Sequence, residues 1–171
     1  MKPDPGHEVT TCPPVQNGTL VLGIGNPVMG DDGIGPRAVD LLADRDLPPG
    51  VRVEEAGVPG WGLPNWLAGW SRVILIDAVH MGEQPGTWRR FSPEQVRLIA
   101  SGQAVSLHEP GLANGLELAQ ALDLLPEEIV IYGVEPAGNL PGQGLSPAVH
   151  SAFPGLVDTI CAEIWNGNTQ R

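Results

Sequence analysis

TLVLGIGNPVMGDDGIG, residues 19–35, joins a short apolar run to a glycine-rich loop that carries two adjacent carboxylates. An apolar run of this length, rich in β-branched residues, is typical of a strand buried in a parallel sheet. Apolar residues at helical spacing follow from 36 to 47, where Pro-Pro-Gly ends the pattern. The stretch therefore predicts a strand, a loop and a helix in the order of an α/β fold.

The rest of the chain repeats this alternation. Strands are predicted at 51–57, 72–79 and 127–136, an edge strand at 87–91, and helices at 62–70, 111–125 and 145–165, the last bent or interrupted at Pro154. SPEQ, residues 92–95, has the form of a capping box that starts a further short helix. The order predicts a three-layer α/β/α sandwich around a mostly parallel sheet of about five strands. We expect one domain over 19–166, with a loose tail at 1–18 and a short tail at 167–171.

The composition excludes several classes of protein. The 171 residues are 42% hydrophobic, and no run approaches the ~20 apolar residues of a membrane span, so membrane insertion is not expected. The start is polar and broken by prolines, unlike a secretory signal. A net charge of −11 argues against a nucleic-acid partner. Cys12 and Cys161 form neither a C-x-x-C motif nor a disulfide framework, which favours a reducing, cytoplasmic location.

The glycine-rich loop has the spacing of a phosphate-binding loop but the opposite charge. Gly25 and Gly30 match G-x-x-x-x-G, yet Asp31 and Asp32 stand where such a loop carries Lys and Ser or Thr. Val28 replaces the third glycine of a dinucleotide fingerprint. Two carboxylates would repel a phosphate, so the loop suits a cation instead. One Asp of the pair can cap the following helix, which leaves the other free to face a cleft.

Polar side chains recur where the predicted strands end. Ligands of parallel sheets bind outside the carboxyl ends of the strands, so these positions are candidate site residues. They are Asp77 after the strand at 72–79, His108 after a short β-like run, and Glu135 after the last strand. Asn26 is expected to shape the turn after the first strand, with contact to a substrate chain as its alternative. Asn26, Asp31 and Glu135 are the further candidates for lining the cleft, with a structural salt bridge as the alternative for Glu135.

Four pieces of sequence, taken in order, resemble the nickel-iron hydrogenase maturation endopeptidases. They are GIGNPVMGDDGIG (23–35), VILIDAV (73–79), SLHEPGL (106–112) and GVEP (133–136), and the resemblance covers about residues 19–165. Each piece alone is a weak signal, whereas the ordered set is specific. The resemblance implies an enzyme that removes the C-terminal extension of the hydrogenase large-subunit precursor after nickel has been inserted.

The resemblance also implies a metal-binding triad. By position its members are Asp32, Asp77 and His108, and the metal is nickel supplied by the substrate, with zinc or cadmium expected to substitute in crystals. Relatives often have Glu at the second loop position, so Asp31 stays open as the alternative to Asp32. The chemistry agrees, because two carboxylates and an imidazole suit Ni²⁺ or Zn²⁺ and leave positions for further ligands. His80, three residues past Asp77, is expected to be an exposed loop residue.

The expected chemistry is hydrolysis by water. The chain has no G-x-S-x-G motif and no cysteine near the candidate site, so a serine or cysteine nucleophile is unsupported. Asp32 or Asp77 is expected to act as general base, and the sequence does not choose between them. The alternative function is a non-catalytic nickel-binding chaperone that docks on the large subunit. The four scattered histidines argue mildly against metal storage.

Overall fold

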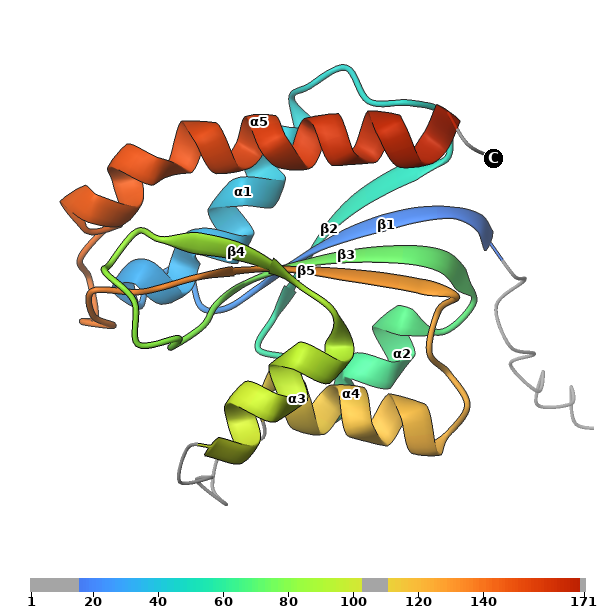
Figure 1. Ribbon diagram of the computed structural model, residues 1–171. Coiled ribbons are helices and arrows are strands. Elements are labelled where there is room, and N and C mark those ends of the chain that lie inside the picture. Colours follow the sequence, from blue (N-terminus) through green and yellow to red (C-terminus); the bar gives the residue numbers. More distant parts are fainter. Residues whose placement is uncertain (1–15, 103–110, 170–171) are drawn as a thin grey trace, which may run out of the picture.

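In the part of the chain that the structure describes, five strands form one sheet in the order β2-β1-β3-β5-β4. The structure is a computed structural model, and it describes residues 16–102 and 111–169 (Figure 1). The strands are β1 (Gln16–Ile24), β2 (Val51–Gly57), β3 (Trp70–Ala78), β4 (Trp88–Phe91) and β5 (Glu128–Val134). The four strands other than β4 pair in parallel, and β4 pairs antiparallel with β5 at the edge. The predicted edge strand and the mostly parallel sheet of about five strands are confirmed.

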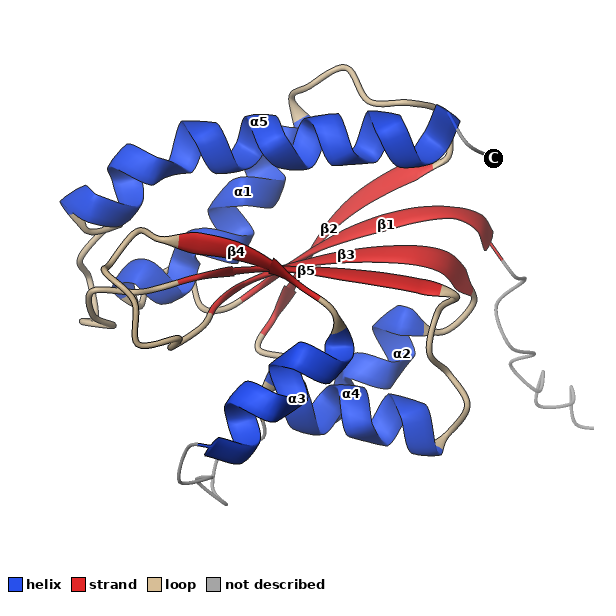
Figure 2. Cartoon of the chain, in the orientation of Figure 1, coloured by secondary structure: helices blue, strands red, loops and turns tan. Residues whose placement is uncertain are grey.

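Helices cover both faces of this sheet, as Figures 1 and 2 show. They are α1 (Ile34–Ala43), α2 (Leu63–Leu67), α3 (Pro93–Gly102), α4 (Leu112–Ala121) and α5 (Pro147–Thr169), with short 3-10 helices η1 (Gly30–Gly33) and η2 (Gly60–Gly62). One face packs against α1 and α5, and the other against α2, α3 and α4. The three-layer prediction is therefore confirmed. No helix in the described ranges is long and apolar enough to cross a membrane.

Alternation along β3 explains why both faces are covered. Ile74 and Ile76 belong to the core beneath α1 and α5, whereas Val73 and Leu75 belong to the core beneath α2 and α4. All four side chains are 0% exposed. Successive residues of a strand point to opposite faces, so a continuous run of apolar residues needs a layer on each side.

Several element boundaries differ from those predicted. Strand β1 begins at Gln16, inside the stretch expected to be a loose tail, because Gln16 pairs with Trp70 of β3. Helix α5 runs without interruption past Pro154 and continues to Thr169. The capping box is confirmed, because Ser92 N–H donates to Gln95 Oε1 at 2.8 Å and Gln95 N–H donates back to Ser92 Oγ at 3.5 Å.

The strand order places a reversal between β1 and β3. From β1 the chain crosses over through α1 to β2 on one side, and the next strand, β3, pairs on the other side of β1. Connections that leave neighbouring parallel strands in opposite directions open a crevice at the carboxyl ends of those strands. The loop after β1 and the end of β3 meet at this crevice.

Candidate active site

A cleft of about 750 Å³ opens at the carboxyl ends of β1 and β3. Its walls come from five segments: the end of β1 with its loop, the turn after β2, the end of β3, the start of α4 and the segment after β5. The described residues that line it are Ile24, Gly25, Asn26, Met29, Asp32, Val58, Pro59, Gly60, Trp61, Gly62, Leu63, Asp77, Ala78, Gly111, Leu112 and Asn139. Asp32 and Asp77 are the only charged residues of this set, so the cleft is acidic and largely apolar.

Asp32 is held by the loop in which it lies. The backbone N–H of Asn26 donates to its Oδ2 at 2.7 Å, and Val28 N–H donates to the Asn26 side chain at 3.1 Å. Gly25, with a φ of 125°, allows this close turn, because a Cβ there would overlap the carbonyl oxygen of Asp32. Asn26 therefore both shapes the turn and lines the cleft, as its two sequence-based expectations required.

Asp77 lies at the end of β3, partly buried at the base of the same cleft. Burial and, to a lesser extent, the negative charge of Asp32 raise the pKa of its carboxyl, and the backbone N–H of Ala78 lowers it; together they move this pKa from 3.8 to about 7. A negative charge beside a poorly hydrated carboxyl disfavours ionisation of that carboxyl. The structure thus brings these two predicted site residues together.

Asp31 serves a different purpose from its neighbour. Its side chain is 1% exposed, and it accepts hydrogen bonds from the backbone N–H groups of Ala137, at 2.8 Å, and Ser146, at 2.6 Å. Its own N–H donates to the Gly138 carbonyl at 3.3 Å. Both carboxylate oxygens are therefore engaged by the segment that follows β5. Asp31 is not among the residues that line the cleft.

Glu135 anchors the loop that follows β3 through hydrogen bonds to its backbone. It is 5% exposed, and its Oε2 accepts hydrogen bonds from the N–H groups of Met81, at 2.6 Å, and Glu83, at 3.1 Å. His80 lies 3.4 Å away, exposed as expected, so a weak ion pair accompanies these bonds. Burial alone would raise the pKa of Glu135, but the two backbone N–H groups and His80 together lower it. Glu135 also stands outside the residues that line the cleft.

The third predicted metal ligand, His108, lies outside the described residues. Within those residues, no group of three or more His, Cys, Asp or Glu side chains converges to hold a metal ion. Asp32 and Asp77 supply two oxygen donors at one place, which is compatible with a borderline divalent ion but needs additional ligands.

The sequence reasoning missed one wall of the cleft. Val58, Pro59, Gly60, Trp61 and Gly62 form the turn after β2, and the side chains of Val58 and Trp61 are 69% and 58% exposed. The signal was present, because a Pro- and Gly-rich turn at the carboxyl end of a parallel strand belongs at the same edge as Asp77. By contrast, Leu63 and Leu67 of the helix that follows this turn are buried.

Comparisons of the sequence with known proteins agree on one family. The family model described as hydrogenase maturation protease matches residues 36–163. The hydrogenase expression/formation protein HupD of Bradyrhizobium diazoefficiens is 31% identical over 147 residues, 85% of this chain and 77% of that protein. HupM of Azotobacter chroococcum is 36% identical over 119 residues, 69% of this chain and 57% of that protein. The chain thus spans little more than half the length of some of these relatives.

Solved structures give the same result for the fold. The hydrogenase maturating endopeptidase HybD from E. coli superposes with a TM-score of 0.77 at 29% identity, covering 88% of this chain and 93% of that one. The [NiFe] hydrogenase maturation protease HybD from Thermococcus kodakarensis has a TM-score of 0.68 at 31% identity, covering 86% and 99%.

Proposed function

Because the chain belongs to the hydrogenase maturation protease family, we propose that it is an endopeptidase that removes the C-terminal extension of a nickel-iron hydrogenase large-subunit precursor. One observation carries the proposal: Asp32 and Asp77 face a single cleft at the β1–β3 reversal, close enough that the charge of one raises the pKa of the other. Such perturbed groups in a cleft mark functional sites.

The recognition element in this proposal is the nickel ion that the precursor already carries. Asp32 and Asp77 each offer a carboxylate oxygen to it, and His108 offers an imidazole nitrogen. Gly111, three residues after His108, lines the cleft, which supports this assignment. Asp31 is set aside as the ligand, because both of its oxygens already accept hydrogen bonds from Ala137 and Ser146.

The reaction is hydrolysis of one peptide bond by water. A carboxylate of the pair accepts a proton as the water oxygen attacks the scissile carbonyl carbon, and it returns that proton to the leaving amine as the C–N bond breaks. Binding the segment beside the pair supplies most of the selectivity, because fixed geometry can contribute ~7 kcal/mol or more. The cleft offers no other charged side chain within the described residues.

The test uses matched precursor samples with and without nickel, incubated with the protein and measured by intact mass. Nickel-loaded precursor should lose a C-terminal peptide, and nickel-free precursor should stay whole. Asp32→Asn and Asp77→Asn should each slow the cut at least ~10³-fold, the scale seen when an essential acid or base is removed. Asp40→Asn is the control, because Asp40 is exposed on α1 away from the cleft.

The outcomes separate this proposal from its alternative. Equal cutting of both samples would exclude nickel recognition but leave the protease assignment standing. A wild-type protein that binds nickel-loaded precursor tightly and never shortens it would instead establish the nickel-binding chaperone. Wild-type rates in Asp77→Asn would exclude Asp77 from the machinery.

A further inference from the structure

Several exposed apolar side chains lie on the segments that form the acidic cleft. Seven large hydrophobic residues of the described chain are exposed: Val28, Leu41, Val58, Trp61, Leu122, Leu140 and Trp165. Val58 and Trp61 line the cleft directly, and Val28 and Leu140 directly adjoin the lining residues Met29 and Asn139 in the sequence. Four of the seven thus lie on the loops that form the cleft. We call Val28, Val58, Trp61 and Leu140 the apolar collar.

The two sides of the collar stand on separate segments that the structure holds in place. Val58 and Trp61 belong to the turn after β2. On the other side, Gly142 N–H donates to the Val28 carbonyl at 2.9 Å, and this bond joins the loop after β1 to the segment that contains Leu140. Asp31 fixes both ends of that segment through its bonds to Ala137 and Ser146. Hydrogen bonds therefore fix the segments that carry Val28 and Leu140, and the exposure of these two side chains belongs to an ordered surface.

Exposed apolar side chains beside paired carboxylates have a physical consequence when a partner covers them. The contact expels water, and the attraction between the carboxylates and a cation strengthens as the local dielectric constant falls. Protein interfaces commonly combine a central anchor with surrounding contacts that exclude water, and aromatic residues such as Trp are enriched among the anchors. Trp61, 58% exposed in the free protein, is placed to act in this way.

We propose that the apolar collar is the docking surface for a folded precursor whose own surface is apolar around a bound cation. This inference rests on the proposed function and adds to it. The collar would supply the affinity for the precursor, and the carboxylates would position the scissile segment and carry out the cleavage. Charge complementarity selects the occupant. Val58 and Trp61 line the same cleft as the carboxylates, on a chain of net charge −11, so a partner that presents a cation-binding site within an apolar patch complements it. An anionic membrane would be repelled by the same charge.

The test measures binding separately from cleavage. Nickel-free precursor of the large subunit, which the proposed function leaves uncut, is immobilised, and the dissociation constant of each variant is determined by biolayer interferometry. Trp61→Ser should weaken binding by ~10-fold or more, and Val28→Ser combined with Leu140→Ser by ~3-fold or more, typical of central and peripheral apolar contacts. With nickel-loaded precursor, Trp61→Ser should raise KM and leave kcat near wild type.

Matched controls come from the exposed apolar residues outside the collar. Trp165→Ser on α5 removes a tryptophan on the opposite face of the sheet from α2 and α4, and Leu122→Ser removes a leucine just past the end of α4. Both should change affinity less than ~2-fold. Zn²⁺ binding by calorimetry should be the same in Trp61→Ser and wild type, because the substitution spares the carboxylates.

Three results would overturn the docking surface. The first is wild-type affinity in Trp61→Ser together with wild-type affinity in the Val28 and Leu140 double variant. The second is a wild-type dimer in sedimentation that Trp61→Ser dissociates, which would assign the collar to a second copy of the chain. The third is Trp61-dependent binding to vesicles of zwitterionic lipid. A protein that binds precursor through the collar but does not cut it would refute the protease and retain this inference.

Discussion

At the amino ends of the central strands, the buried Arg72 of β3 lies between Glu163 and Glu128. At the carboxyl ends, Asp32 and Asp77 share a cleft that no cationic residue of the described chain lines. The Arg72 guanidinium is 1% exposed, 2.6 Å from Glu163 Oε1 and 3.0 Å from Glu128 Oε2. No described Arg, Lys or His forms an ion pair with either carboxylate of the cleft. The same sheet thus carries one group of charges that ion pairs neutralise and one pair of like charges, the two carboxylates of the cleft.

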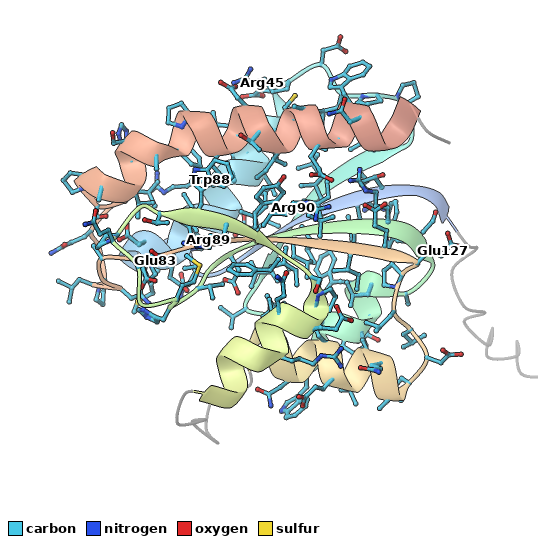
Figure 3. The ribbon with its side chains drawn as sticks, viewed as in Figure 1. Arg45, Glu83, Trp88, Arg89, Arg90 and Glu127 are labelled. Carbon is cyan, nitrogen blue, oxygen red and sulfur yellow. The ribbon has the colours of Figure 1, made fainter. Side chains whose placement is uncertain are left out.

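Glu163 of α5 is the centre of the neutralised group. Arg90 donates to Glu163 at 3.1 Å and lies between β4 and α5, as Figure 3 shows, and Tyr132 donates its hydroxyl to the same carboxylate at 3.1 Å. Burial alone would raise the pKa of Glu163, but the hydrogen bond and charge of Arg90, the Tyr132 hydroxyl and the charge of Arg72 lower it. Every buried charge here has a partner, which is what a structural role requires.

The contrast teaches how to separate function from support in this fold. A polar group that serves stability has a partner within the protein. Arg72 is ion-paired, and Asp31 and Glu135 accept hydrogen bonds from backbone N–H groups. At Asp77, by contrast, burial and the charge of Asp32 raise the cost of ionisation, and a divalent ion would relieve that cost. Substitutions of the partnered residues should therefore destabilise the folded protein. Substitutions in the acidic pair of the cleft should stabilise it.

The largest effect should follow from Arg72→Met, which removes the guanidinium and keeps much of the volume. It removes the ion-pair partner of Glu128 and one of the two arginines that pair with Glu163, so the free energy of unfolding should fall by ~3 kcal/mol. Urea denaturation at pH 7 measures this, with Arg37→Met, an exposed position on α1, as the control. A loss below ~1 kcal/mol would mean that the pairing around Glu163 is not the stabilising element we describe.

Asp31→Asn should cost less, ~2 kcal/mol, because an amide offers one acceptor where two backbone N–H groups now donate. One of the bonds to Ala137 and Ser146 is lost, and the amide nitrogen then faces a donor. Denaturation of Asp31→Asn is compared with Asp40→Asn, which should match wild type. If Asp31→Asn is as stable as the control, the hydrogen bonds from the segment after β5 to Asp31 do not contribute measurably to stability.

Sequence reasoning recovered what depends on local pattern. The alternation of strands and helices, the capping box at Ser92 and the strand-end position of Asp77 all follow from residues close together in the chain. It did not recover the partners of Asp31, which are 106 and 115 residues away, or the pairing of Arg72 with Glu163 across 91 residues. Such contacts depend on how the layers pack, and no local periodicity encodes them. The two carboxylates of the loop looked equivalent for this reason.

Asp77→Asn should raise the free energy of unfolding, whereas the two substitutions above should lower it. Because the folded-state pKa of Asp77 is about 7 against 3.8 in the unfolded chain, the folded protein binds this proton more tightly, and wild-type stability is lost as pH rises from ~4 to ~7. The neutral Asn escapes that loss. Asp77→Asn should therefore be more stable than wild type at pH 8 by ~1–2 kcal/mol, a value reduced for the partial exposure of the carboxyl, and equal to it at pH 4. A destabilised variant at pH 8 would contradict the electrostatic cost assigned to the cleft.

The smallest effect concerns Tyr132, the only tyrosine in the sequence, whose ionisation can be followed alone by its absorbance near 295 nm. Burial, followed by the charge and hydrogen bond of Glu163, raises the pKa of its hydroxyl from 10.0 to about 12, so wild-type stability should decline as pH increases from ~10 to ~12. Tyr132→Phe loses one hydrogen bond, so at pH 8 it should be less stable by ~1 kcal/mol, and this deficit should shrink above pH 10. Glu163→Gln should lower the tyrosine pKa in the folded protein, because it removes the negative charge that disfavours the phenolate. A folded-state titration of Tyr132 near pH 10, unchanged by Glu163→Gln, would show that the hydroxyl is solvated and lies outside the neutralised group.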